Sequence, residues 1–490
     1  MSAGNFDKTI KGLSSQTLVT IVLGILEIVS FSIMSRLLTK TEFGYYAAIM
    51  SVIMIFRSLA EAGIGASVIQ RKNADSSYIN TAYSLALVVG IIATIIVVLL
   101  SNIFSRLIAD DTICIPLMLI SVTLIPYSLN SVYKAFLLKH LHFLRLGIFQ
   151  IAAFVVSNTI AVIMAVYNFG LYSIVTGNIL NILLQNVILR YFSQTKFQFT
   201  IDRNKISDIL SFGGWLTLSR LTGSIYNQLD KILMAKLLSV YELGNFYRTR
   251  GLIESINSQI GGVFDVTLFP ILSGIQDERE AIQNAYKKSL NLGCIFFSLL
   301  FLYFFFNAKL IIYLFLGEKW LDQILLFRVL SFSMVIYFLT RLADCFIRSL
   351  ALVKFGFAVK LLSCCLLIVG ILFFYIYGSI GIAVVILVTN IISATVKTWY
   401  ICHRTGVSMG SLFQSTIRGL LYSIPLVVLG IAYLLLYDST FINSVMFFLL
   451  FTIAVLIILL HFPKVVGGVY YKQIYPVLCN KIRVLYHKLK

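Results

Sequence analysis

Charged residues are scarce in this chain of 490 residues: Asp, Glu, Lys and Arg make up 12% of it, whereas hydrophobic residues make up 59%. An ordinary soluble domain has roughly 25% charged residues, because it needs a polar surface around its core. Prolines, which interrupt helices, number only six. These shortages argue against a large soluble domain and indicate a protein that folds within a lipid bilayer.

Patterns typical of catalysis or metal binding are also missing. The seven cysteines show no CxxC spacing, and His140 and His142 are two residues apart, which places them on different faces of a helix. The sequence contains no GxSxG, P-loop, HExxH or DxD motif. It therefore predicts no metal site and no cofactor, and it predicts that the protein is not an enzyme.

Long apolar segments are abundant. A membrane-spanning helix needs about 20 mostly apolar residues, and about fourteen such segments follow one another along the chain. We predict an all-α, polytopic membrane protein with an N-terminal six-helix bundle in residues 1–200 and a C-terminal six-helix bundle in residues 201–410. Residues 411–490 are predicted to add two transmembrane helices and a basic amphipathic tail that lies on the cytoplasmic surface.

Lys and Arg residues outside the predicted spans are distributed unevenly. With the N-terminus in the cytoplasm, 26 of them fall in inner segments or at inner helix ends, and six fall in outer segments. Since cytoplasmic segments of membrane proteins are enriched in Lys and Arg, both termini are predicted to be cytoplasmic. The same asymmetry accounts for the net charge of +19, so no nucleic acid is expected as a partner.

A short motif occurs twice in the chain, two hundred residues apart. The copies are RLLTKTEFG at Arg36–Gly44 and KLLSVYELG at Lys236–Gly244. Six predicted helices separate them, and because six is an even number, the two bundles have the same orientation in the membrane. A pseudo-two-fold axis along the membrane normal is therefore expected to relate them. Two bundles related in this way are typical of transporters that rock about a central site.

Ionisable residues within the predicted spans are the main functional signal, because each costs about 2.5 kcal/mol or more at the bilayer centre unless it is paired or hydrated. Basic residues on the seventh and eighth spans outnumber the acids there, which indicates a hydrated cavity for an anion. The predicted substrate-binding residues are Arg57, Arg220, Asn227, Lys231, Arg248, Arg250 and Arg341. The acids proposed for coupling transport to a proton or sodium gradient are Glu27, Glu61, Asp230, Glu254 and Asp265.

An alternative interpretation applies to two pairs of neighbouring charges. Arg57 and Glu61 are four residues apart, and Arg341 and Asp344 are three apart, so each pair faces the same side of its helix. Each could be an internal ion pair that only stabilises the helix packing.

Two stretches carry a resemblance to a known family. They are Ser35–Lys72, which includes Glu61, and Phe212–Asp277, which includes Asp230-Lys231 and Tyr247-Arg248. Both are similar to bacterial Wzx-type polysaccharide flippases of the multidrug/oligosaccharidyl-lipid/polysaccharide exporter superfamily. The resemblance implies two six-helix bundles around a central cavity, with Asp230, Lys231, Tyr247 and Arg248 as the residues matched to the family motifs.

The resemblance also implies a substrate, a location and partners. The expected substrate is an undecaprenyl-pyrophosphate-linked oligosaccharide, moved from the cytoplasmic to the outer leaflet of the bacterial inner membrane for O-antigen, capsule or exopolysaccharide assembly. A polysaccharide polymerase and chain-length machinery are candidate partners. A cation-coupled drug or metabolite antiporter of the same superfamily and a membrane-embedded glycan polymerase or transferase remain as alternatives.

Overall fold

The computed structural model describes residues 3–61, 63–71, 75–108, 110–139, 143–193, 198–276, 278–421, 423–436 and 441–461. Every regular element in these ranges is a helix, which confirms the predicted all-α class. The chain divides into two compact units. Unit 1 consists of Met1–Leu252 and Cys364–Ile382, and unit 2 consists of Ile253–Ser363 and Ala383–Lys490. The predicted basic tail helix lies outside the described residues.

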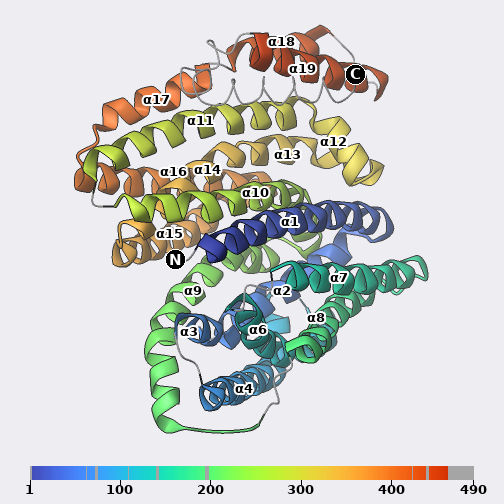
Figure 1. Cartoon of the computed structure of the whole chain (residues 1–490). Helices are drawn as coiled ribbons and strands as arrows, with labels where there is room; N and C mark the ends of the chain where they lie inside the picture. Colours follow the sequence, from blue (N-terminus) through green and yellow to red (C-terminus); the bar gives the residue numbers. More distant parts are fainter. Residues whose placement is uncertain are drawn as a thin grey trace, which may run out of the picture. The chain divides into compact units, whose positions relative to one another are not determined.

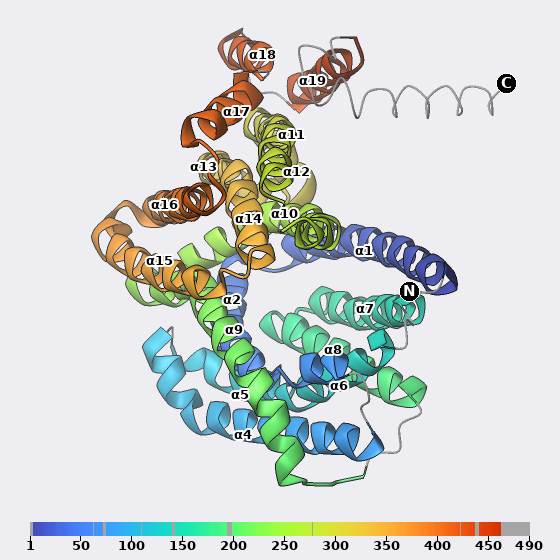
Figure 2. The same cartoon turned by 60° about the vertical axis from the view of Figure 1, so that its left-hand side comes forward.

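Unit 1 contains ten of the α-helices, in whole or in part, within its N-terminal segment (Figures 1 and 2). They are α1 (Ala3–Leu37), α2 (Lys40–Glu61), α3 (Ile64–Gln70), α4 (Ser76–Ile108), α5 (Cys114–Ser121), α6 (Leu124–Lys139), α7 (Phe143–Val166), α8 (Leu171–Ser193), α9 (Arg203–Leu237) and the first part of α10 (Val240–Gly274), with the 3-10 turn η1 (Asp111–Ile113) before α5. Helix α2 packs against α4, α6, α8 and α9, and α7 packs against both α1 and α8. The tight turn between α7 and α8 uses Asn168 and Gly170, both with positive φ.

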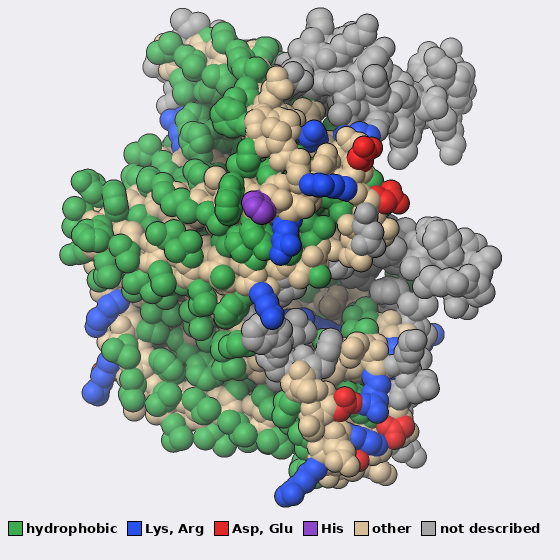
Figure 3. Space-filling view, turned by 90° about the vertical axis from the view of Figure 1, so that its left-hand side faces the viewer, with side chains coloured by type: hydrophobic (Ala, Val, Ile, Leu, Met, Phe, Trp, Pro, Cys, Tyr) green, Lys and Arg blue, Asp and Glu red, His purple; other side chains and the backbone are tan. Residues whose placement is uncertain are grey.

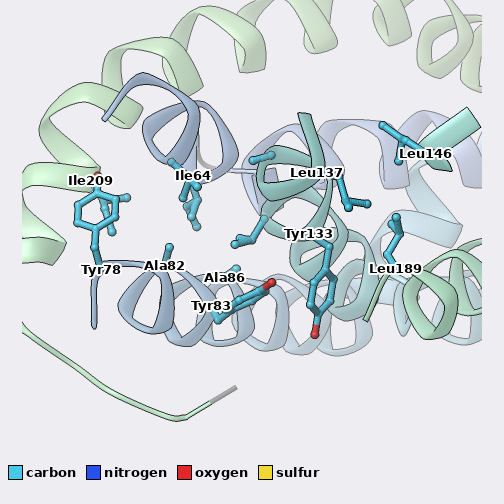
Figure 4. Close-up of a cluster of buried hydrophobic side chains, with 13 residues drawn as sticks. Ile64, Tyr78, Ala82, Tyr83, Ala86, Tyr133, Leu137, Leu146, Leu189 and Ile209 are labelled. Carbon is cyan, nitrogen blue, oxygen red and sulfur yellow. The ribbon is translucent and has the colours of Figure 1, made fainter. Parts of the chain in front are cut away.

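A buried apolar cluster stabilises one end of unit 1 (Figure 4). It combines Ile64 from α3, Tyr78 and Tyr83 from α4, Tyr133 from α6 and Ile209 from α9, with further aliphatic side chains around them. The rings of Tyr83 and Tyr133 have their centroids 4.8 Å apart. Five buried aromatic and aliphatic side chains from four helices fix how these helices approach one another, which in turn positions the polar residues farther along the same helices.

Unit 2 is also built from helices packed through aromatic side chains. Its elements are the rest of α10, α11 (Arg279–Phe306), α12 (Ala308–Phe315), η2 (Glu318–Gln323), α13 (Ile324–Ser331), α14 (Ser333–Ser349), the first part of α15 (Val353–Phe374), most of α16 (Gly378–Thr405), α17 (Met409–Leu421), α18 (Ile424–Leu436) and α19 (Phe441–His461), while η3 (Tyr375–Tyr377) belongs to unit 1. Phe306 of α11, Tyr433 of α18 and Phe447 of α19 belong to one buried cluster. The rings of Tyr433 and Phe447 stack at 4.0 Å.

The protein is a multi-pass membrane protein. Among the described residues, nine helical segments are long and apolar enough to cross a bilayer, from Val19–Leu37 to Lys354–Thr405. Figure 3 shows one face on which hydrophobic side chains are abundant, with the acidic side chains toward the right-hand part and Lys and Arg side chains both there and at the left-hand edge. Helices α9 and α10 are not among these nine segments. They have 35 residues each, a length of about 50 Å, which exceeds a hydrocarbon core of about 30 Å. The count of fourteen spans stays a prediction.

The two copies of the repeated motif contact each other within unit 1. Each copy leads into a helix, α2 after the first copy and α10 after the second. Lys40 of the first copy donates a hydrogen bond from Nζ to the Tyr241 hydroxyl of the second copy at 3.3 Å. Direct contact between equivalent segments is what a local two-fold arrangement produces. The symmetry relation between whole six-helix bundles, and their predicted boundaries at 200 and 410, stay predictions.

Candidate functional site

Polar side chains from five helices of unit 1 form a connected set, here named the polar cluster. Its members are Tyr46, Arg57 and Glu61 of α2, Tyr127 and Lys134 of α6, Asn178 of α8, Arg220 and Lys231 of α9, and Tyr247 of α10. The helices α2, α6 and α8 also carry buried apolar side chains, among them Ile53, Val132 and Ile182. Packing of these apolar side chains therefore brings the polar side chains together.

Arg57 is the most buried charged member of the polar cluster, with 7% of its surface exposed. Its Nη2 donates a 2.7 Å hydrogen bond to Asn178 Oδ1, and its guanidinium lies 5.0 Å from the centre of the Tyr127 ring. Its Nε has no hydrogen-bond partner. No acid within the described ranges forms an ion pair with it, so this buried guanidinium keeps both its charge and an unused donor.

Glu61 of α2 contacts α9 and α6, and it does not form an ion pair with Arg57. Arg220 Nη1 of α9 donates to Glu61 Oε2 at 2.8 Å, and the Tyr127 hydroxyl donates to Glu61 Oε1 at 3.1 Å. Lys134 lies close enough to interact electrostatically with both Glu61 and Arg57. The alternative interpretation of an internal Arg57–Glu61 pair is therefore wrong, because the acid is paired with another helix.

Two aromatic contacts extend the polar cluster toward α9 and α10. Asn178 Nδ2 donates to the Tyr46 hydroxyl at 3.1 Å, and the Tyr46 and Tyr247 rings meet edge to face at 6.3 Å. The Lys231 ammonium lies 5.5 Å from the centre of the Tyr247 ring. Basic groups are thus held beside tyrosines, whose ring faces attract cations and whose hydroxyls can bind polar groups.

The other predicted residues of unit 1 lie in different surroundings. Arg250 forms an ion pair with Asp230, which is 2% exposed and has no hydrogen-bond partner at Oδ1. Arg248 donates from Nε to Ser35 Oγ at 2.6 Å and from Nη2 to the Phe31 carbonyl oxygen, and its guanidinium stacks on the Phe31 ring at 3.3 Å. These contacts fasten α10 to α1. Arg248 is as buried as Arg57, but its guanidinium is occupied by α1.

The remaining predicted residues are not part of the polar cluster. Asn227 and Glu27 are exposed residues of unit 1. Glu254 is exposed in unit 2, where Arg341 donates to the Tyr337 hydroxyl at 2.6 Å. The acid near Arg341 in sequence, Asp344, pairs with Lys397 at 2.6 Å. The side chain of Asp265 lies outside the described part of the chain.

Five residues of the polar cluster were not predicted as substrate-binding or coupling residues: Tyr46, Tyr127, Lys134, Asn178 and Tyr247, of which Tyr247 was matched only to the family motif. Tyr46, Tyr127 and Asn178 are polar residues within predicted apolar segments. Helical spacing, however, shows only which residues share a face of one helix, and not which other helix they contact. Their contact with Arg57 and Glu61 crosses from α2 to α6 and α8. In the polar cluster, Arg220 pairs with Glu61, whereas Arg57 has no acid partner among the described residues, so the arrangement favours an anion with several oxygens at Arg57.

Comparison with known proteins identifies a family and several relatives of this chain. Residues 33–325, more than half of the chain, match the model of a family described as "Polysaccharide biosynthesis protein". The chain is 28% identical over 319 residues to an uncharacterized membrane protein in the cps region of Klebsiella pneumoniae. It is 22% identical over 317 residues to the lipopolysaccharide biosynthesis protein WzxC of Escherichia coli and 22% identical over 318 residues to the teichuronic acid biosynthesis protein TuaB of Bacillus subtilis.

These relatives are matched over only part of their length. Each alignment covers 64% of this chain, and it covers 65%, 64% and 65% of the three relatives in turn. The region matched by the family model, residues 33–325, includes the polar cluster.

Solved structures with the same fold are membrane transporters. The lipid II flippase MurJ in an inward closed conformation superposes with a TM-score of 0.71 at 13% identity, over 91% of this chain and 98% of that one. An inward-facing multidrug resistance MATE family transporter of the MOP superfamily superposes with a TM-score of 0.63 at 15% identity, over 80% and 98% of the two chains. At these identities the likeness establishes the fold alone.

Proposed function

The chain belongs to the polysaccharide biosynthesis protein family, which confirms the Wzx-type resemblance, and we propose from this that it is a flippase for a lipid-linked oligosaccharide. The proposed substrate is an undecaprenyl-pyrophosphate-linked repeat unit. It would pass from the cytoplasmic to the outer leaflet of the bacterial inner membrane and there supply O-antigen, capsule or exopolysaccharide assembly. Both termini would lie in the cytoplasm, and no covalent reaction would be catalysed.

The observation that carries this proposal is that Arg57 is buried and has no carboxylate partner among the described residues. A buried guanidinium without a carboxylate partner is costly in a membrane, so its presence needs a compensating anion during the transport cycle. A pyrophosphate has several oxygens, and an Arg can bind two of them through parallel N–H donors. Lys134 adds positive charge close enough to Arg57 to interact with it electrostatically.

The proposed mechanism is alternating access. The pyrophosphate would follow the basic side chains of the polar cluster, while the polyprenyl tail stays in the bilayer and the glycan occupies the hydrated space. Parallel repeats in transporters rock about such a midplane site. Coupling to a proton or sodium gradient would involve one of the membrane acids, with Asp230 supported by its burial and its unpaired Oδ1.

The alternatives differ in the charge that their sites require. A drug or metabolite antiporter for cations would need an acidic cavity, whereas the polar cluster contains Arg57, which has no acid partner among the described residues. A polymerase or transferase would need groups for acid–base chemistry at the acceptor. The polar cluster offers Glu61, but this carboxylate is occupied by Arg220 and Tyr127.

The test is complementation of a flippase-null strain, with surface polysaccharide and membrane protein level both measured. Arg57→Gln, Arg220→Gln and Lys231→Gln should each lower surface polysaccharide at normal protein level, and Arg57→Glu should lower it most. Arg57→Lys should lower surface polysaccharide less than Arg57→Gln does, because Lys retains the positive charge but not the two-donor geometry of Arg.

Arg248→Gln is the matched control, since Arg248 has the same 7% exposure but is held by Ser35 and Phe31. It should lower the membrane level of the protein, because it removes a packing contact. If all the Arg57 variants export polysaccharide normally, the proposed anion site is wrong.

A further inference from the structure

A second basic site lies in unit 2, far along the chain from the polar cluster. An open groove of about 460 Å³ is formed where α10, α11, α14 and α16 end or begin, and its wall includes Gln276, Arg279, Arg404 and Thr405. On the predicted topology, this end of unit 2 faces the cytoplasm. The flippase proposal does not use these residues.

The chain holds the Arg279 guanidinium in one position at this groove. Arg279 Nε donates to the Thr405 carbonyl oxygen at 2.8 Å, and Gln283 Nε2 donates to the same oxygen at 2.8 Å. Gly406 follows with φ of 74°, and a Cβ there would overlap the guanidinium. The turn after α16 is therefore shaped around the arginine, which leaves its terminal nitrogens available to the groove.

Arg404 supplies the second guanidinium. It lies 5.7 Å from the centre of the Tyr400 ring, and Tyr400 stacks on Phe355 at 3.8 Å. Both arginines are exposed, and neither is paired with an acid within the described ranges. Two unpaired guanidiniums on one groove match an oxyanion with several oxygens, such as a phosphate group.

The surface of α16 indicates where the phosphate comes from. Val384, Val388 and Ile391 form an apolar stripe along this helix, with 41%, 47% and 48% exposure, and Trp399 continues it at 55% exposure. α16 lies beside α14 in Figure 2 and is joined to it by the Lys397–Asp344 pair. Exposed Trp side chains mark the membrane–water interface. Arg404 is five residues beyond Trp399, a rise of roughly 7.5 Å, which is the depth of lipid head groups.

We propose that the Arg279–Arg404 groove binds the phosphate of an anionic membrane phospholipid, in preference to a zwitterionic one, and that the acyl chains of this lipid lie along the apolar stripe of α16. Basic pockets between helices on the cytoplasmic side of membrane proteins bind anionic head groups in this manner. The bound lipid would stabilise the α10–α11 and α16–α17 connections of unit 2.

The test uses the full-length protein in phosphatidylcholine nanodiscs that contain about 10 mol% of brominated phosphatidylglycerol or brominated phosphatidylcholine. Bromine quenches the fluorescence of a nearby Trp, and the quenched component that disappears in Trp399→Phe belongs to Trp399. Brominated phosphatidylglycerol should quench this component more than brominated phosphatidylcholine. Arg404→Gln should reduce the preference about fivefold, as expected for one basic side chain near an anionic lipid.

The controls separate the site from general surface charge and from free phosphate. Arg145→Gln removes an exposed basic residue of unit 1 and should leave the preference for phosphatidylglycerol unchanged. Arg404→Lys should retain most of this preference, because it keeps the positive charge. Inorganic phosphate in the buffer should leave the preference unchanged if the lipid is the source. Displacement by inorganic phosphate would overturn the lipid assignment and identify a soluble phosphate as the ligand. Equal quenching by the two lipids, or a preference unaltered by Arg279→Gln and Arg404→Gln, would overturn the site itself.

Discussion

Gly44 of α2 and Gly244 of α10 pack backbone against backbone, although two hundred residues separate them. A Cβ at Gly44 would overlap the carbonyl oxygen of Val240, and a Cβ at Gly244 would overlap that of Lys40. Val240 and Lys40 occupy the same position in the two copies of the repeated motif, so the contact is reciprocal. Only glycine lets two helices approach so closely.

We expect Gly44→Ala and Gly244→Ala each to destabilise the protein, because the atoms in the way are backbone atoms that cannot rotate aside. Overpacking of this kind costs about 1–3 kcal/mol. Gly223→Ala is the matched control, since no atom lies within 4 Å of a Cβ at that helical position, and Ala favours a helix by about 1 kcal/mol over Gly. Thermal unfolding of the purified proteins should place the first two variants below the wild type and Gly223→Ala at or above it. Equal unfolding temperatures for Gly44→Ala and Gly223→Ala would contradict the contact.

Asn178→Asp should abolish export while leaving the protein folded. The new carboxylate would replace the amide oxygen that lies 2.7 Å from Arg57 Nη2, and it would form the ion pair that Arg57 lacks. An internal acid then competes with the substrate anion. Asn178→Ala should have a milder effect, because it removes one hydrogen bond and leaves the charge available. Surface polysaccharide is measured against membrane protein level, and normal export by Asn178→Asp would show that Arg57 does not meet the substrate.

Swapping the charges of Glu61 and Arg220 should destabilise the protein less than removing either charge alone. Glu61→Gln leaves Arg220 without its 2.8 Å partner, and Arg220→Gln leaves the carboxylate with Tyr127 alone. The double variant Glu61→Arg with Arg220→Glu restores an opposite-charge pair between α2 and α9. Contacting residues typically show coupling energies of about 0.5–3 kcal/mol. Additive effects in a double-mutant cycle of unfolding free energy would show that the pair contributes nothing to the packing of these helices.

Neutralising one membrane acid should uncouple transport from its driving ion. The variants are Glu27→Gln, Glu61→Gln, Asp230→Asn, Glu254→Gln and Asp265→Asn, and Asp230→Asn is expected to have the largest effect because Asp230 is the most buried acid described among these five. In proteoliposomes, an imposed proton or sodium gradient should accelerate transport by the wild type and not by the uncoupled variant. Undiminished acceleration in all five variants would eliminate coupling through these acids.

The predicted orientation can be checked by cysteine labelling in a variant that lacks the seven native cysteines. In intact cells an impermeant thiol reagent should label Lys40→Cys and Asp110→Cys, which lie in predicted outer segments. Ser76→Cys and Ser408→Cys should be labelled only after the cells are opened. Labelling of the latter two in intact cells would reverse the topology that the distribution of Lys and Arg predicts.

Much of this protein follows from its sequence. The shortage of charge and the long apolar segments determine an all-α membrane protein, because only helices and closed barrels satisfy backbone hydrogen bonds in lipid. The spacing of Arg36–Gly44 and Lys236–Gly244 identifies equivalent positions. Charges within apolar segments mark Arg57, Glu61 and Arg220 as functional candidates, because lipid makes each of them costly.

The tertiary structure alone decided what each of these residues does. In sequence, Glu61 is one turn from Arg57, yet it pairs with Arg220 on another helix and leaves Arg57 with Asn178 and Tyr127. Arg248 and Arg57 are equally buried, but contact with α1 makes the first a packing residue. Helical periodicity specifies the face on which a side chain lies, whereas its partner depends on which helix packs against that face. That choice is made by apolar surfaces far from the charged groups, so no local pattern of residues records it.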